Sequence, residues 1–274
     1  MTKTTMQKLG IIAGNGSLPW ALMTECQKQG RPFCVVALKG HANPDLIPAD
    51  IPVKWIRLGA VGQGFHEMKK QGVKEVVLIG GVRRPSLKEL CPDLRGLKFF
   101  AKIGVKALGD DGLLRSVINE IENDGFKVVG IDDIMPSLLA PKGVLGTIKP
   151  SEADKTDINH GFDVAKILGS ADVGQAVIVQ QGLVLSVEGI EGTAALIKRT
   201  KTLKRNGDGG VLVKVSKPQQ ERRVDLPTIG PNTIQDIYDA GFKGVAVEAG
   251  SVLIAECEQT IQLANKLGIF IVGV

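Results

Sequence analysis

The segment from Val211 to Thr233 holds the densest group of residues that could bind or cleave a charged substrate. It opens with valines at alternate positions, the pattern of a strand, and then becomes charged over twelve residues, with Lys214, Lys217, Glu221, Arg222, Arg223 and Asp225. Prolines and glycines interrupt the rest of the segment, which predicts an ordered loop. Arginine donates hydrogen bonds as a planar fork and lysine acts as a point charge, so this loop suits an anionic, oxygen-rich ligand. A solvated turn with surface ion pairs is the alternative.

One acid, Asp225, ends the charged run and is followed by the rigid, apolar pair Leu226 and Pro227. A carboxylate placed among cations stays ionised, because the positive charges favour its charged form. An ionised carboxylate at a fixed position suits the binding of a divalent cation or the activation of a water molecule. Asp225 is therefore the leading candidate for a catalytic residue and for a metal ligand.

A glycine turn in the first half of the chain is a second candidate site. Gly14, Asn15 and Gly16 lie where an apolar strand gives way to a helix, and backbone N–H groups at such a junction can hold a phosphate. A dinucleotide fold would place a third glycine where this chain has Pro19, and an acid after the second strand, where this chain has Lys39. Nicotinamide chemistry is thus disfavoured, as is P-loop chemistry, because the sequence lacks GxxxxGK[ST]. A tight turn without a ligand is the alternative.

Three weaker candidates lie elsewhere in the chain. Arg83 and Arg84 follow a predicted strand, at the edge where α/β proteins bind ligands, and suit either a phosphate or solvent. Asp110 and Asp111 precede a predicted helix, where they would either cap it or bind a metal. Thr193 ends the sequence SVEGIEGT and opens another helix, which predicts either an anion nest or a simple cap.

Short apolar strands alternate with helical stretches, which predicts mainly parallel sheets covered on both faces. In the first half, strands are expected at 8–13, 33–38, 53–58, 75–79 and 126–131, and helices at 18–28, 64–71, 94–108 and 112–123. In the second half, Ser151 is expected to cap a helix. Further helices there are expected at 152–168, 193–202, 233–240 and 253–267, and strands at 176–179, 183–187, 244–247, 269–272 and from 211 onward.

The predicted fold class is α/β with two domains. The first, over 1–135, is expected to be Rossmann-like with a mainly parallel sheet. A segment rich in proline and glycine, 136–150, is expected to be a linker. The second domain, over 151–274, is expected to be a mixed α/β domain.

The composition indicates a globular protein. The chain has 274 residues, of which 43% are hydrophobic and 23% charged, with a net charge of +5. This mild positive charge favours an anionic substrate or an anionic membrane surface. The four cysteines form no CxxC pair, and neither a secretory signal nor a membrane-spanning stretch is evident, so a reducing cytosol is expected.

Taken together, five motifs resemble those of the LpxI-type UDP-2,3-diacylglucosamine pyrophosphatases of lipid A biosynthesis in Gram-negative bacteria: GIIAGNGSLP, GGVRRP, GDDGLLR, SVEGIEGT and KPQQERRVDLPTIGPNT. The resemblance covers essentially the whole chain. Its most specific part is the last motif, because the family pattern there reads KPxQDxRxDLPxIG. This chain has Glu221 where aspartate is usual, whereas Arg223 and Asp225 match the pattern.

The resemblance implies hydrolysis of the diphosphate of UDP-2,3-diacylglucosamine to UMP and 2,3-diacylglucosamine 1-phosphate (lipid X), assisted by Mg²⁺, with two domains holding the substrate between them. It implies that Asp225 is essential, as a ligand of Mg²⁺ or as the group that positions water, and Asp110 and Asp111 are further candidate metal ligands. Diphosphate hydrolysis requires charge neutralisation and a positioned water, which agrees with these residue types. The expected substrate-binding residues are Gly14, Asn15, Gly16, Arg83, Thr193, Lys214, Lys217 and Arg223.

The implied lipid substrate places the expected enzyme in the cytoplasm, peripherally on the inner face of the inner membrane. Nucleic acid is not an expected partner, and a homodimer is compatible with the sequence. Three alternatives stay open from the residues. They are a non-catalytic module that binds a nucleotide sugar or a lipid, a nicotinamide oxidoreductase, and a pyrophosphatase of soluble nucleotide sugars.

Overall fold

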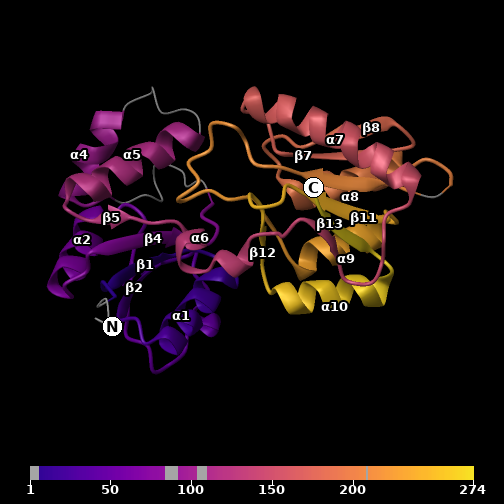
Figure 1. The fold of residues 1–274 in the computed structure, drawn as a ribbon. Helices are drawn as coiled ribbons and strands as arrows, with labels where there is room; N and C mark the ends of the chain where they lie inside the picture. The colour runs from indigo at the N-terminus through magenta and orange to yellow at the C-terminus, as the bar shows by residue number, and fades with distance from the viewer. Residues whose placement is uncertain (1–5, 84–91, 104–109, 208) are drawn as a thin grey trace. The chain divides into compact units, whose positions relative to one another are not determined.

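The structure, a computed structural model, describes residues 6–83, 92–103, 110–207 and 209–274, and for 102–103 and 110–111 it describes the backbone alone. The chain divides into two compact units, each built around its own sheet (Figure 1). Unit 1 comprises Met1–Pro136 and Glu221–Val224, and unit 2 comprises Ser137–Gln220 and Asp225–Val274. The predicted α/β class with two domains is confirmed.

Unit 1 contains a five-stranded parallel sheet in the order β3-β2-β1-β4-β5. Its central strand, β1, has the buried apolar sequence LGIIA and pairs on both sides. Strands buried on both faces read as continuous apolar runs, which is why they were predictable. The strands of unit 1 are β1 (Leu9–Ala13), β2 (Phe33–Leu38), β3 (Val53–Ile56), β4 (Glu75–Ile79) and β5 (Lys127–Val128).

Helices cover the two faces of this sheet. The chain passes from β1 to β2 and β3 in one direction, and then crosses to β4 and β5 in the other. Right-handed crossovers therefore place the helix that connects β1 with β2 on one face, and the helices that connect β3 with β4 and β4 with β5 on the other, as Figure 1 shows. The helices of unit 1 are α1 (Leu18–Gln29), α2 (Val61–Lys70), α4 (Leu94–Ile103), α5 (Asp110–Asn123) and α6 (Ile131–Ile134), with a 3₁₀ turn, η1, at Pro44–Leu46.

The predicted strand 126–131 is wrong beyond its first residues. Only Lys127–Val128 pairs with β4, and α6 begins at Ile131. The side chain of Asp133 accepts a hydrogen bond of 3.0 Å from the backbone N–H of Gly130, which turns the chain into this short helix. A cap formed by a residue inside the helix overrides the strand propensity of the preceding valines.

Unit 2 contains a six-stranded mixed sheet in the order β6-β13-β11-β9-β7-β8. The three central strands, β13, β11 and β9, run parallel, whereas β6 and β7 are antiparallel to their neighbours in this group, and β8 is antiparallel to β7. The strands are β6 (Gly143–Leu145), β7 (Ala176–Gln180), β8 (Leu183–Val187), β9 (Val211–Lys214), β11 (Gly244–Val247) and β13 (Phe270–Gly273), and a separate parallel pair comprises β10 (Thr228–Ile229) and β12 (Leu253–Ile254).

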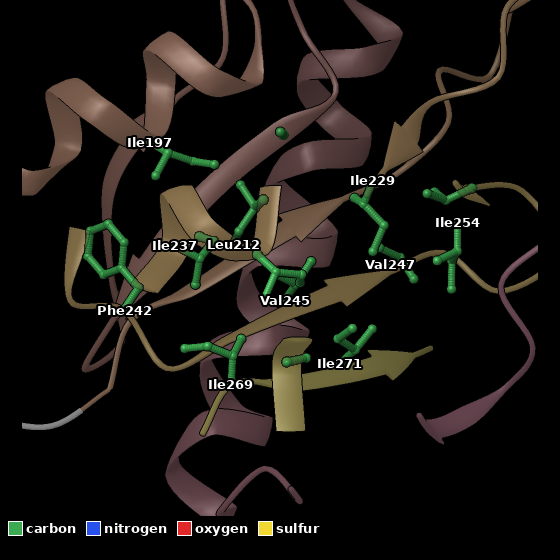
Figure 2. Close-up of a cluster of buried hydrophobic side chains, with 14 of the residues drawn as sticks. Ile197, Leu212, Ile229, Ile237, Phe242, Val245, Val247, Ile254, Ile269 and Ile271 are labelled. Atoms are coloured by element: carbon green, nitrogen blue, oxygen red, sulfur yellow. The ribbon is translucent and has the colours of Figure 1, made fainter. Parts of the chain in front are cut away.

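Side chains alternate between the two faces of the sheet along the central strands, so each face has its own hydrophobic core. Leu212, Val245 and Ile271 belong to the cluster shown in Figure 2, whereas Val213 and Ala246, the next residues of β9 and β11, belong to the cluster on the opposite face. The helices of unit 2 are α7 (Glu152–Ser170), α8 (Thr193–Thr200), α9 (Pro231–Ala240) and α10 (Cys257–Leu267), with 3₁₀ turns η3 at Pro136–Leu138 and η4 at Lys201–Leu203. The predicted cap of α7 is confirmed, because Ser151 accepts a hydrogen bond of 3.2 Å from the N–H of Asp154.

Two predictions for unit 2 need correction. The predicted linker 136–150 contains β6, which pairs with β13 at the edge of the sheet. The predicted helix 253–267 begins only at Cys257, because Leu253–Ile254 pairs with β10 and Glu256 has a φ of 47°. β6 and the strand Leu253–Ile254 are both short, and the strands that pair with them lie far away in the sequence. Within the described residues, none of the helices is long and apolar enough to cross a membrane.

Candidate functional site

The topology of unit 2 collects polar residues at one edge of its sheet. Lys214 ends β9 and Glu248 follows β11, and the parallel course of these strands brings their ends together. Because β7 runs antiparallel and pairs Ala176 with Lys214, the preceding residue, Gln175, lies at the same edge. Glu188, which follows β8, joins it there, since its carboxylate accepts a hydrogen bond of 3.0 Å from the N–H of Gln175. This edge is the candidate site in unit 2.

Lys214 is a buried cation, with 6% of its surface exposed. Its Nζ donates to Oγ1 of Thr193 at 2.9 Å and to the backbone oxygen of Thr228 at 3.0 Å. Burial lowers the pKa of its ammonium group below the ordinary value, and the carboxylates of Glu188 and Asp225 oppose this shift only in part. A buried ammonium of this kind is stable only where hydrogen bonds and opposite charges surround it.

Thr193 connects Lys214 to a buried carboxylate. Its hydroxyl donates to Oε1 of Glu188 at 2.6 Å while it accepts from Lys214. The side chain comes from the first residue of α8, directly after Gly192, whose φ of 80° turns the chain into the helix. The candidate Thr193 thus lies between two opposite charges at this edge.

Asp225 is half-buried at the same edge and is held by an amide. Nε2 of Gln220 donates to its Oδ2 at 2.6 Å, and Oε1 of Gln220 accepts from the N–H of Lys217 at 3.1 Å. Lys214 is close enough for its charge to interact with that of Asp225. A partly exposed carboxylate beside a buried cation can orient a water molecule or bind an ion.

The other two candidate cations of the charged loop have carboxylate partners. Nζ of Lys217 lies 2.8 Å from Oδ1 of Asp172. Arg223 contacts Glu221 at 2.9 Å and Glu122 at 2.8 Å, and its hydrogen bond to Glu221 is the main cause of a raised pKa of its guanidinium. The positive charges of Lys217 and Arg223 are thus already partly neutralised by carboxylates.

Four residues of the loop belong to unit 1, although the sequence predicted a loop wholly within the second domain. Arg222 pairs with Asp132 of α6 at 2.8 Å, and Glu122, the partner of Arg223, lies on α5. Val224 packs against the hydrophobic cluster of unit 1 that includes Phe65 and Ile121. The chain therefore leaves unit 2 after Gln220 and re-enters it at Asp225.

Glu248 fixes the start of the charged loop. Its Oε1 lies 2.6 Å from Nζ of Lys166, and its Oε2 accepts from the N–H and the hydroxyl of Ser216 at 2.8 and 2.7 Å. Burial raises the pKa of the Glu248 carboxyl, but the hydrogen bonds from Lys166 and Ser216 outweigh burial, and the net shift is downward. Sequence reasoning missed Glu248, because its partners are distant in the chain.

Replacement of Glu248 by glutamine is expected to lower stability in a pH-dependent way. Since the folded-state pKa is below that of the unfolded chain, the ionised carboxylate stabilises the protein above about pH 4.5, and this contribution is lost as the pH falls through the folded-state value. Urea unfolding from pH 3 to pH 8 measures the difference between wild type and Glu248→Gln. We expect a constant difference above about pH 5 that shrinks at lower pH. A difference that grows toward low pH would contradict this assignment.

The glycine turn of unit 1 is closed by its own backbone. The N–H of Gly14 donates to the oxygen of Ile79 at 2.8 Å, and Asn15 and Gly81 exchange two backbone hydrogen bonds of 2.8 and 2.9 Å. The N–H of Gly16 donates to the side chain of Asn15 at 2.9 Å. The turn lies between the ends of β1 and β4, where the direction of the chain across the sheet reverses and α/β folds commonly bind ligands. A phosphate held by these three N–H groups would have to displace the present acceptors.

Arg83 follows this turn, and the prediction for it stays untested. It is exposed, and its backbone N–H donates to Nδ1 of His41 at 3.3 Å. Its neighbour Arg84 lies outside the described residues.

Gly80 allows the close approach of the two backbones in this turn. It has a φ of 94°, and a Cβ atom there would lie 2.6 Å from the backbone oxygen of Asn15. Gly72 also has a positive φ, of 72°, but a Cβ atom there would meet nothing within 4 Å. Gly72→Ala is therefore expected to cost about 1 kcal/mol of stability, and Gly80→Ala about 2 kcal/mol more. Urea unfolding of both variants measures the difference, and equal losses would show that the contact with Asn15 is unimportant.

The residues at the edge of unit 2 fit a magnesium ion that is bound jointly with a substrate. Within the part of the chain that the structure describes, no cluster of three or more His, Cys, Asp or Glu side chains could hold a metal. Magnesium is often bound by one or two carboxylates together with substrate phosphates, so Asp225 can supply the protein ligand alone. The hydrogen bond from Gln220 reaches its Oδ2, and no described residue hydrogen-bonds to its Oδ1, so Oδ1 can face an ion or a water. The side chains of the other candidate ligands, Asp110 and Asp111, lie outside the described residues.

These features define a two-unit α/β protein in which a carboxylate, a buried lysine and side-chain amides meet at one sheet edge. Family models described as the LpxI N-terminal domain and the LpxI C-terminal domain match residues 8–138 and 141–272. The chain belongs to the LpxI family, which confirms the resemblance seen in its motifs. It is 41% identical, over 98% of both chains, to a Caulobacter vibrioides protein named UDP-2,3-diacylglucosamine pyrophosphatase LpxI.

A solved structure of CobK precorrin-6A reductase is also similar to this chain. It shares 11% sequence identity, covers 96% of this chain and 86% of its own, and has a TM-score of 0.34. This likeness is too low to support an argument about fold or function.

Proposed function

We propose that this protein hydrolyses the diphosphate of UDP-2,3-diacylglucosamine to UMP and 2,3-diacylglucosamine 1-phosphate, with Mg²⁺ as its cofactor. Membership of the LpxI family and the name of its Caulobacter relative support the substrate. The observation that carries the proposal is the placement of Asp225, which is half-buried, held by Gln220 at 2.6 Å and near the buried Lys214.

Hydrolysis forms a bond from the water oxygen to one phosphorus and breaks the bond from the bridging oxygen to that phosphorus. Attack at either phosphorus gives the same two products. The reaction requires a water in line with the leaving group and a means of offsetting negative charge on the phosphate oxygens. Bound magnesium would neutralise negative charge on the diphosphate, and Asp225 is the residue proposed to hold the magnesium ion. Asp225 would also orient the attacking water through its Oδ1.

Lys214 is proposed to act mainly through its charge. An ammonium group has three N–H donors, and two of those on Lys214 already bind Thr193 and Thr228. Its positive charge is fixed at the edge of the sheet before any substrate arrives, so no reorganisation is required when charge develops on the phosphate oxygens. This role is consistent with the expectation that Lys214 contributes to substrate binding by neutralising phosphate charge.

We also propose that the protein works at the cytoplasmic face of the inner membrane as a peripheral enzyme. A substrate with two acyl chains resides in a bilayer, and a net charge of +5 gives a weak, salt-sensitive attraction to anionic lipids. Sedimentation with vesicles that contain anionic lipid, at low and high salt, tests this part of the proposal.

A comparison of acylated and deacylated substrates tests the proposed specificity. Purified protein would be incubated with UDP-2,3-diacylglucosamine or with UDP-glucosamine, each with Mg²⁺, and UMP would be quantified. We expect release from the acylated substrate at a rate at least about 100-fold higher, because the acyl chains contribute binding energy. Equal rates would favour a pyrophosphatase of soluble nucleotide sugars. Binding of the acylated substrate without turnover would instead favour a non-catalytic binding module.

A further inference from the structure

Gln220 makes a short contact to the proposed catalytic carboxylate. Its Nε2 lies 2.6 Å from Oδ2 of Asp225 and 3.4 Å from Oε1 of Gln175. Its Oε1 accepts from the backbone N–H of Lys217 at 3.1 Å. Both the nitrogen and the oxygen of the amide therefore make hydrogen bonds, and these bonds fix the position of the side chain.

The partners of Gln220 also define which end of the amide faces Asp225. An ionised carboxylate only accepts hydrogen bonds, so it requires the NH₂ end, while the backbone N–H of Lys217 requires the carbonyl end. A rotated amide would place oxygen against oxygen at Asp225 and nitrogen against N–H at Lys217. The hydrogen-bond network thus allows one orientation.

The course of the chain explains why Asp225 needs such a contact. The four residues between Gln220 and Asp225 belong to unit 1, where Arg222, Arg223 and Val224 make their contacts. The backbone before Asp225 is thus fixed by groups that are not part of the sheet of unit 2. The hydrogen bond from Gln220 joins the last residue before this excursion to the first residue after it.

We propose that Gln220 is a positioning residue for the hydrolysis, which holds Oδ2 of Asp225 and thereby directs Oδ1 toward the bound ion or water. This inference rests on the proposed function of Asp225 and adds a residue to it. The charge of Lys214 interacts with the carboxylates of both Asp225 and Glu188.

Gln220→Ala is expected to lower kcat for UDP-2,3-diacylglucosamine by about 30-fold to 100-fold, with KM changed less than about threefold, because misplacement of a reacting group by about 1 Å can cost that much. Gln220→Asn keeps the amide but is too short to reach, and is expected to match the alanine variant. Gln219→Ala is the control, because Gln219 donates to the backbone oxygen of Gly169 at 2.8 Å. Its kcat is expected to stay within twofold of wild type. A kcat for Gln220→Ala within twofold of wild type would overturn the proposal.

The pH profile of Gln220→Glu distinguishes positioning from a merely structural role. At neutral pH the introduced carboxylate repels Asp225, whereas at acid pH its protonated form can donate as the amide does. The activity of Gln220→Glu relative to wild type is thus expected to rise by about tenfold as the pH falls from 8 to 5. The relative activity of Gln220→Ala is expected to stay constant over that range. Parallel profiles for the two variants would overturn the proposed hydrogen bond.

Crystal structures of wild type and Gln220→Ala give a readout that does not depend on turnover. The proposal predicts that the Asp225 carboxylate rotates or shifts in the variant while the strands of unit 2 stay in place. An unmoved carboxylate would overturn the positioning role. If wild type hydrolyses none of the substrate, the proposed function fails, and the two crystal structures still decide whether Gln220 holds Asp225.

Discussion

Asp225→Asn is expected to reduce kcat for hydrolysis of UDP-2,3-diacylglucosamine by about 10³-fold, the size of effect typical for loss of one group that stabilises the transition state electrostatically. The substitution keeps the size of the side chain and an oxygen that can accept from Gln220, so the fold should be preserved. What is lost is the negative charge that would orient the water and bind the ion. Steady-state kinetics with magnesium in excess measures the effect.

Asp239→Asn is the matched control for this variant. Asp239 is exposed on α9 and accepts a hydrogen bond of 2.9 Å from Gln235 in the same helix. Its loss is expected to leave kcat within twofold of wild type. If Asp225→Asn retained more than about a tenth of the wild-type kcat, Asp225 would have no place in the mechanism.

Lys214→Met is expected to lower the free energy of unfolding by about 3 kcal/mol and to reduce kcat strongly as well. Removal of one charge from a group of buried, opposite charges leaves the remaining charge buried without a partner, which typically costs about 3–5 kcal/mol. Here the remaining charge is Glu188, which is 5% exposed and reaches Lys214 through Thr193. Urea unfolding and steady-state kinetics measure the two effects.

The double variant Lys214→Met with Glu188→Gln separates stability from activity. With both charges removed, most of the stability is expected to return, because an uncharged pair of similar volume is often as stable as a buried ion pair. The kcat is expected to stay low, because the positive charge near Asp225 is still missing. If the double variant regained wild-type kcat, Lys214 would be a structural residue only. If Lys214→Met alone were as stable as wild type, the buried charge set would not exist in solution.

The sequence pattern predicted the interior strands of the sheets well, but it did not predict the short peripheral strands. Phe33–Leu38 and Glu75–Ile79 form strands with the predicted bounds, because burial on both faces demands a continuous apolar run. β6 and β12 were missed, since each has only two or three residues and is defined by a partner far away in the chain. An alternating hydrophobic pattern cannot be recognised over two or three residues.

For the candidate site, the sequence indicated the charged groups but not their partners. Asp225 and Lys214 were singled out, whereas Glu188 and Gln220 appeared only within motifs, and Gln175 carried no charge that would indicate a role. One available signal was missed. Lys214 lies between Val213 and Val215, both fully buried, and a lysine at the end of such a strand is a candidate for a buried cation. The excursion of Glu221–Val224 into unit 1 had no local signal, because it depends on acids of α5 and α6.

The most direct test of the proposed reaction is the hydrolysis of UDP-2,3-diacylglucosamine by the purified wild-type protein, with Mg²⁺ and with a chelator. We expect UMP and 2,3-diacylglucosamine 1-phosphate to appear in equal amounts with Mg²⁺ and both to disappear when the chelator is added. Full activity in the chelator would contradict the role of the metal. Absence of both products with Mg²⁺, from a folded protein that binds the substrate, would contradict the proposed hydrolysis itself.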